Sequence, residues 1–287
     1  MCFYYYISMK KDIKSIVKRI GRANKLLEML SYLIQNNILY DTLNFSGDGD
    51  FMPDPESIYN RFKEIAIQYN SAYPYDLKNK TILEIGPGRS LTSCYYLSQI
   101  SQCKKVYAHD AYGQVWQDID RIIVERYFQN VSNVHYLVGK NALSEITDKV
   151  DYIVSNAVLE HIWNLDELIE QLSEVSHKNT IMFHIIDFRN HNKFSKYGDL
   201  YFLKYSDTLW KWMASNVGHP NRLRMNNYEN IFIKHGFTFE PFEVEYYDDA
   251  SVRHAIDTYL SRRYADNDLP ALYVKSAKVI SKRKYEL

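Results

Sequence analysis

Five short apolar segments alternate with helical stretches between residues 81 and 187, and this alternation constrains the fold more than any other feature of the chain. The segments cover residues 81–85, 105–109, 134–138, 151–155 and 180–186. Some are apolar throughout, as strands are when helices cover both faces of a parallel sheet. Helical patterns are predicted between them, at 90–98, 115–128 and 159–175. Two more extended segments, 237–247 and 271–282, flank a helix predicted at 251–264. The pattern predicts an α/β fold with a mostly parallel sheet.

Two regions lie outside this alternation. Apolar residues recur at three- and four-residue steps from residue 10 to about residue 80, with a break rich in Gly, Asp and Pro at 44–55. We therefore expect an N-terminal helical cap over residues 1–80. Residues 188–225 are aromatic, mixed in charge and too long for an ordinary connection. They predict a loop-like insertion at 188–227, ahead of a helix at 228–235, and we expect this insertion to bind substrate.

Charge and cysteine content exclude several classes of protein. The chain has 35 Lys and Arg against 35 Asp and Glu, which argues against a protein that coats nucleic acid or an anionic membrane. The apolar residues 1–9 precede two lysines, the reverse of a signal peptide, and Met9 is an alternative start. Cys2, Cys94 and Cys103 have no metal-ligand spacing. We expect a cytoplasmic protein with neither a disulfide framework nor a zinc site, and no metal ligands are assigned.

The first predicted strand ends in Glu84-Ile-Gly-Pro-Gly88. Gly86 and Gly88 let the backbone approach a ligand where a Cβ would intrude. A dinucleotide-binding loop would carry a third glycine, but that position holds Leu91. Pro87 also removes one amide donor, and a pyrophosphate is bound by amides. The loop therefore favours a ligand without a pyrophosphate, although a tight structural turn would explain Gly-x-Gly alone.

Polar residues follow the next strands of the predicted sheet. Asp110 closes the second strand, at the spacing of an acid that accepts hydrogen bonds from ribose hydroxyls. Asn141 follows the third strand, where an adenine would be held. The fourth strand continues directly into Ser155-Asn-Ala-Val-Leu-Glu-His-Ile162. In an open α/β sheet, ligands bind beyond the carboxyl ends of the strands, so these positions predict one site.

This order of motifs resembles the class I S-adenosylmethionine-dependent methyltransferases over about residues 80–187. The resemblance implies a Rossmann-like seven-stranded sheet, mostly parallel with its last strand antiparallel, within a methyltransferase domain at 81–287. It also implies S-adenosyl-L-methionine as the cofactor. Glu84 and the glycine loop would contact the methionine part, Asp110 the ribose, residues near Asn141 the adenine, and residues 156–160 the sulfonium. The full set of implied cofactor-binding residues is Glu84, Gly86, Pro87, Gly88, Asp110, Ala111, Asn141, Ala142, Asn156, Ala157 and Glu160.

Residues 187–191 and 221–224 resemble a bacterial subgroup of this family that occurs with polysaccharide and nucleotide-sugar biosynthesis. The implied methyl acceptor is a small molecule, either an anionic sugar or a nucleotide-linked sugar. We expect no partner among nucleic acids or membranes. Arginines hold phosphates or carboxylates by bidentate contacts, and indole rings stack on sugars. The expected substrate-binding residues are Arg189, Trp210, Asn221, Arg222 and Arg224, although ion pairing or core packing would also explain the arginines and the tryptophan.

A hydroxyl acceptor needs a base, and histidine suits this role near neutral pH. His191 is the first candidate, with Asp187 to orient its ring, and His161 is the second. A phosphate oxygen or an amine is the alternative acceptor. Two other readings remain open, a nicotinamide-dependent enzyme and a non-catalytic cofactor-binding subunit. The chain lacks the Asn/Asp-Pro-Pro-aromatic motif of many nucleic-acid methyltransferases after its fourth strand.

Overall fold

The computed structural model describes residues 25–37, 54–191, 198–215, 219–260, 264 and 269–284. The chain divides into two compact units. The sheet unit comprises residues 52–188, 223–246 and 274–287, and the second unit comprises residues 1–51, 189–222 and 247–273. The predictions made for residues 1–9 and for most of the break at 44–55 lie outside the described residues.

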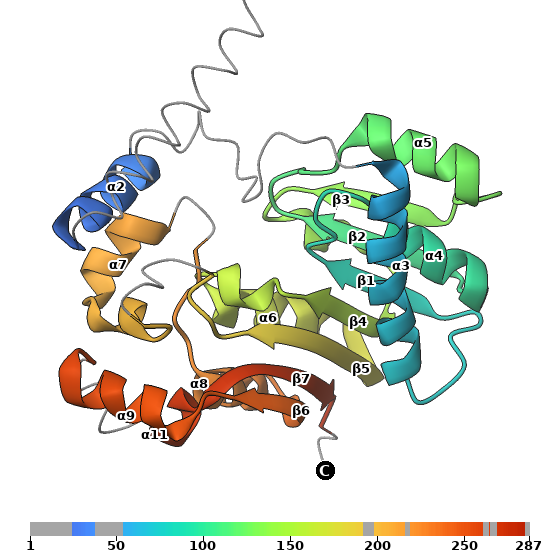
Figure 1. Ribbon diagram of the computed structural model, residues 1–287. Coiled ribbons are helices and arrows are strands. Elements are labelled where there is room, and N and C mark those ends of the chain that lie inside the picture. The colour runs from blue at the N-terminus through green and yellow to red at the C-terminus, as the bar shows by residue number, and fades with distance from the viewer. Residues whose placement is uncertain are drawn as a thin grey trace, which may run out of the picture. The chain divides into compact units, whose positions relative to one another are not determined.

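The sheet unit is built on seven strands in the order β3-β2-β1-β4-β5-β7-β6. Strands β1 to β5 are parallel, and β7 runs antiparallel to both of its neighbours. Each change of strand order needs a crossover, and helices supply the crossovers between the parallel strands (Figure 1). The strands are β1 (Thr81–Ile85), β2 (Lys105–Asp110), β3 (Val134–Val138), β4 (Val150–Asn156), β5 (Ser176–Asp187), β6 (Glu240–Tyr246) and β7 (Val274–Lys282).

Helices cover both faces of this sheet (Figure 1). Side chains alternate along β1, so that Ile82 packs in the layer of α3 (Pro55–Ala72) and α4 (Thr92–Ser101). Leu83 packs on the opposite face, in the layer of α6 (Leu165–Val175) and α8 (Met225–Lys234). Helix α5 (Gln117–Tyr127) lies beside α3 and shares a smaller apolar cluster with it. Burial on both faces explains why the central strands are apolar.

The predicted fold class is confirmed, with a seven-stranded sheet whose last strand is antiparallel. Some predicted elements were wrong in detail. The helix expected at 159–175 is a 3₁₀ turn, η2 (Leu159–His161), followed by α6. The helix expected at 251–264 is α9 (Asp249–Thr258), which begins earlier because Asp248 accepts a hydrogen bond from the Ser251 amide.

The predicted domain boundary at residue 80 differs from the observed division. Helix α3 belongs to the sheet unit, because Ala66, Tyr69 and Tyr73 pack against the sheet with α4. The segment 247–273, which joins β6 to β7, belongs instead to the second unit.

The second unit is helical in its described residues. It contains α2 (Lys25–Asn37), η4 (Tyr201–Lys204), α7 (Asp207–Ala214), α9 and α11 (Leu269–Leu272). The Asn36 side chain donates to the Trp212 carbonyl at 2.7 Å and so joins α2 to α7. The insertion expected to be loop-like thus carries two ordered helical elements. Among the described residues, no helix combines the length and the apolar composition needed to cross a bilayer.

One polar pair is buried in the core between β4 and β5. The Ser155 hydroxyl lies 2.8 Å from His184 Nδ1, and both residues are fully buried. Burial lowers the pKa of His184 to about 3. The Phe232 ring packs against the imidazole at 5.6 Å between centroids, so the surroundings offer little to stabilise a charge. The folded protein therefore keeps this histidine neutral.

This neutrality predicts acid sensitivity. Below about pH 6.5, the unfolded chain binds a proton at His184 that the folded chain does not bind until about pH 3. The free energy of unfolding should fall with decreasing pH, by up to about 1.4 kcal/mol per pH unit from this group. Urea unfolding of wild type and His184→Asn between pH 7.5 and 4.5 checks this. The free energy of unfolding should depend less steeply on pH in His184→Asn than in wild type. His135→Asn, at an exposed position, should keep the wild-type dependence. Equal pH dependence in wild type and His184→Asn would show that His184 does not cause the acid sensitivity.

Candidate functional site

The loops after the parallel strands meet at the carboxyl edge of the sheet, and backbone hydrogen bonds join them. The Gly86 amide donates to the His109 carbonyl at 2.8 Å, and the Gly139 amide donates to the Asp110 carbonyl at 3.0 Å. The His109 ring lies 2.9 Å from the Gly139 carbonyl through Nε2. The ends of β1, β2 and β3 therefore form one connected edge.

Gly86 is the point at which the loop after β4 closes on the loop after β1. Its φ is 66°, and a Cβ there would lie 2.6 Å from Val158 Cγ2. A methyl group would have to displace the Val158 side chain, so glycine is required both for conformation and for space. The turn η2 follows Val158 in the chain, so this contact places η2 directly beside the glycine loop.

Gly88 has the same backbone conformation in a more open setting. Its φ is 75°, and a Cβ would meet only the Phe62 ring, at 3.8 Å. Pro87, between the two glycines, is buried. The space above Gly88 is therefore bounded by α3, an element in which sequence reasoning found no candidate site residue.

Asp110 lies at the end of β2, where the sequence predicted it. Its carboxylate accepts hydrogen bonds from the amides of Tyr112 at 2.8 Å, Gly113 at 3.3 Å and Gln114 at 3.2 Å. These bonds form the turn after β2 and orient the carboxylate. A carboxylate has about four acceptor positions, so capacity remains for a ribose hydroxyl. The role in ribose binding stays a prediction.

The remaining predicted cofactor residues lie at the same edge. Asn141 is exposed, and Ala142 is buried as the first residue of η1 (Ala142–Glu145). Ala111 is half-buried after Asp110. Asn156 ends β4, and Ala157 has a φ of 53° while its amide donates to the Ile185 carbonyl at 2.8 Å. This left-handed residue turns the chain from β4 toward Val158.

The predicted contact between Glu84 and the cofactor does not fit the structure. The Glu84 carboxylate is buried and accepts hydrogen bonds from Tyr69 Oη at 3.1 Å, Ser93 Oγ at 2.6 Å and Cys94 Sγ at 3.0 Å. Burial raises the pKa of Glu84, and these three donors oppose the shift. Glu84 shares the face of Ile82, so its side chain enters the α3/α4 layer. It holds two helices to β1 instead of facing a ligand.

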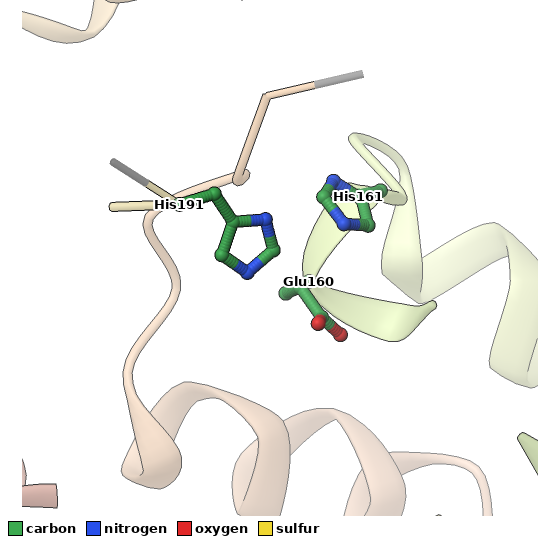
Figure 2. A group of neighbouring side chains, drawn as sticks. All are labelled: Glu160, His161 and His191. Carbon is green, nitrogen blue, oxygen red and sulfur yellow. The ribbon is translucent and has the colours of Figure 1, made fainter. Parts of the chain in front are cut away.

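The turn η2 carries two of the predicted polar residues. Figure 2 shows the Glu160 and His161 side chains projecting from it. Glu160 is buried and His161 is half-buried. The His161 amide donates to the Val158 carbonyl at 2.9 Å, which fixes the turn to the residue seated on Gly86. His191 belongs to the second unit and has a φ of 50°.

Arg224 is a structural residue, contrary to the prediction that it binds substrate. It is fully buried, and its guanidinium donates to the carbonyls of Phe188 at 2.8 Å and Val274 at 2.5 Å. Arg224 is the N-cap residue of α8, and its side chain thus joins the end of β5 to the start of β7. An anionic acceptor has no access to this group.

The same correction applies to two residues of the second unit. Arg222 is buried, donates to the Tyr205 carbonyl at 2.5 Å and pairs with Asp207. Trp210 is also buried, and its indole N–H donates to the Pro220 carbonyl at 2.9 Å. Neither side chain is placed to receive a sugar. Of the other predicted residues, Arg189 is exposed, and Asn221 and Asp187 are half-buried.

The residues that sequence reasoning missed act through contacts between distant segments. His109 joins two loops through its carbonyl and its ring, Val158 fills the space that Gly86 leaves, and Phe62 lies near Gly88. Val158 belongs to the segment 155–162 singled out in the sequence, but that segment gives no sign of its contact with Gly86, and His109 and Phe62 belong to no motif. The alternation of side chains between the two faces of β2 is the one sequence signal that could have assigned His109 to a buried face.

The residues present fit S-adenosylmethionine. Gly88 has no side chain, and only the Phe62 ring lies within 4 Å of the place of a Cβ, so a ligand can approach the backbone there. Asp110 offers an oriented carboxylate at the end of the neighbouring strand. Gly86, Gly88 and Asp110 would hold the methionine and ribose parts, and the loop at Asn141 would flank the adenine.

Comparisons with known proteins agree with this fold. A family model described as a methyltransferase domain matches residues 58–241. No curated protein sequence matches the chain. Similar solved structures include a protein of Galdieria sulphuraria provisionally assigned as a sarcosine dimethylglycine methyltransferase, with 10% identity, a TM-score of 0.50, and coverage of 78% of this chain and 86% of that one. The YcgJ protein of Bacillus subtilis has 10% identity and a TM-score of 0.48, covering 80% and 100%.

A third similar structure is phosphoethanolamine N-methyltransferase 2 of Haemonchus contortus with S-adenosyl-L-methionine. It has 12% identity and a TM-score of 0.49, covering 88% of this chain and 59% of that one. At 10% identity the likeness to the Galdieria sulphuraria protein concerns the fold alone. The family match spans well over half of the chain.

Gly86 and Gly88 form a matched pair for substitution. Both have a left-handed backbone, so Ala at either should cost about 1–2 kcal/mol of folding free energy. Gly86→Ala should cost about 1–3 kcal/mol more, because its methyl group meets Val158. Urea unfolding measures both costs, and Val158→Ala in the Gly86→Ala background should remove the difference. Equal costs at the two positions would contradict the contact.

Asp110→Asn tests the ribose site. Asparagine keeps one oxygen for the turn amides but loses the charge, so S-adenosylhomocysteine binding should weaken by about 1.5–3 kcal/mol. Isothermal calorimetry gives the affinity. Asp148→Asn is the control, since Asp148 pairs with Lys104 and Lys105 and carries no predicted site role. Unchanged affinity in Asp110→Asn would remove Asp110 from the ribose site.

Proposed function

Because the chain belongs to the methyltransferase domain family, and is an S-adenosylmethionine-dependent methyltransferase, we propose that it methylates an oxygen of a small molecule, a sugar hydroxyl in polysaccharide or nucleotide-sugar biosynthesis. The cofactor supplies an activated methyl group on its sulfonium. The protein then has to align the acceptor oxygen with that methyl group and to receive the proton that a hydroxyl loses.

The observation that carries the proposal is the contact between Val158 and Gly86. It fixes η2, with Glu160 and His161, next to the loop assigned to the cofactor. The position of this imidazole supports a role as the general base that receives the proton of a hydroxyl acceptor. We assign this role to His161, with His191 as the second candidate, because His161 lies in the unit that contains the glycine loop.

The engaged arginines favour a hydroxyl over a phosphate as the methyl acceptor. Of the three predicted anion-binding arginines, Arg222 and Arg224 donate to groups of this chain, and Arg189 is exposed. A phosphate oxygen would need no base, whereas a hydroxyl does. The resemblance of residues 187–191 and 221–224 to the polysaccharide-associated subgroup supports a sugar as the molecule that carries this hydroxyl.

A transfer assay tests the acceptor. The protein would be incubated with isotope-labelled S-adenosylmethionine and a panel of nucleotide-sugars, sugar phosphates, unphosphorylated sugars and small amines, and the products identified by mass spectrometry. The expected product is a sugar methyl ether. Transfer to an amine or to a phosphate oxygen, with none to any hydroxyl, would overturn the proposal.

His161→Asn tests the base on the acceptor so identified. If His161 receives the proton, kcat should fall by roughly 10²–10⁴, and S-adenosylhomocysteine affinity should stay unchanged. The wild-type rate should fall on the acid side as the imidazole becomes protonated, and the variant should lack that limb. A loss confined to His191→Asn would transfer the role to His191, and normal kcat in both variants would exclude a histidine base.

A further inference from the structure

The start of α4 is occupied by a carboxylate of this chain. The Leu91 amide donates to Asp120 Oδ1 at 3.0 Å, and Ser90 Oγ donates to the same oxygen at 2.6 Å. The Thr92 amide donates to Ser90 Oγ at 3.2 Å. Asp120 lies in the first turn of α5, and all of these residues belong to the sheet unit. The amides of the N-cap residue Leu91 and of Thr92, the first residue of α4, are thus already bonded.

The carboxylate is built into this position. Asp120 and Ser90 are both buried, and Tyr95 Oη donates to the second carboxylate oxygen at 2.8 Å. Ser90 has one hydroxyl hydrogen, which goes to Asp120, so Thr92 Oγ1, at 2.7 Å, donates to Ser90. Burial raises the pKa of Asp120, and the bonds from Ser90, Tyr95 and the Leu91 amide oppose that shift. Ser90, Tyr95 and the Leu91 amide donate to the carboxylate, and Thr92 donates to Ser90.

This position has a known chemical use in other α/β proteins. The helix after the first strand presents its amino end to ligands, and dinucleotide-binding proteins hold a pyrophosphate there through free amides and the helix dipole. In this chain the Asp120 carboxylate occupies the amino end of α4, bonded to Ser90 and Leu91, two and three residues beyond Gly88. A ligand phosphate would meet a like charge and would find the Leu91 and Thr92 amides engaged.

We propose that Asp120 is a specificity-determining residue, which occupies the phosphate position of the glycine loop and so restricts the site to nucleoside cofactors without phosphate. The sulfonium cofactor carries no phosphate and loses nothing from this arrangement. The proposal concerns the cofactor alone and does not depend on the identity of the methyl acceptor.

Asp120→Asn removes the charge and keeps the shape of the side chain. Calorimetry with S-adenosylhomocysteine, ADP and NADH compares the two kinds of ligand. We expect affinity for ADP to rise at least tenfold in the variant, while affinity for S-adenosylhomocysteine changes less than threefold. Asp118→Asn is the matched control, because it removes the same charge from the same helix turn at an exposed position. It should leave ADP binding at the wild-type level.

Asp120→Ala provides a second test through added anion. The Leu91 amide and the hydroxyls of Ser90 and Tyr95 lose their acceptor in this variant and should bind inorganic phosphate. Its melting temperature should therefore rise with phosphate concentration at constant ionic strength, whereas that of wild type should not. The proposal is overturned if ADP binds Asp120→Asn no better than wild type. It is also overturned if Asp118→Asn gains ADP binding equally, or if phosphate does not stabilise Asp120→Ala.

Discussion

The contact between Gly86 and Val158 is the constraint on which the site depends. Two parallel strands that lie side by side in the sheet, β1 and β4, end in loops that would collide if either carried bulk at the crossing point. The absence of a Cβ at Gly86 lets the Val158 side chain occupy that space. The chain after β4 can then turn through the left-handed Ala157 into η2. Removing the glycine would therefore displace both the loop and the turn that carries His161.

Two buried carboxylates hold the helices around this loop. Glu84 accepts three hydrogen bonds from α3 and α4, and Asp120 accepts three from the start of α4 and from Tyr95. A buried carboxylate is costly unless donors surround it, and here each has them. The result is that α3, α4 and α5 are joined to the segment between β1 and α4 by directional bonds. A loop supported in this way is preorganised for a ligand.

The arginines show why residue type alone is a weak guide to function. Guanidinium groups suit bidentate recognition of phosphate, but they also suit buried carbonyls that no backbone amide reaches. Arg224 donates to two backbone carbonyls, at Phe188 and Val274, where the chain leaves β5 and enters β7. Arg222 does the same at Tyr205 in the second unit. Their positions within the predicted insertion at 188–227 suggested binding, and their burial assigns them to packing.

The sequence by itself determined the fold class, the alternation of strands and helices between residues 81 and 187, and the turns predicted to bind the cofactor. It did so because strand periodicity, glycine in tight turns and acids at strand ends depend on a few neighbouring residues. Only the tertiary structure decided what Glu84, Asp120, Arg222 and Arg224 do. Each has partners from segments distant in the chain, and whether a polar side chain faces a ligand or a buried donor depends on which helices cover it. Local pattern carries no information on that choice.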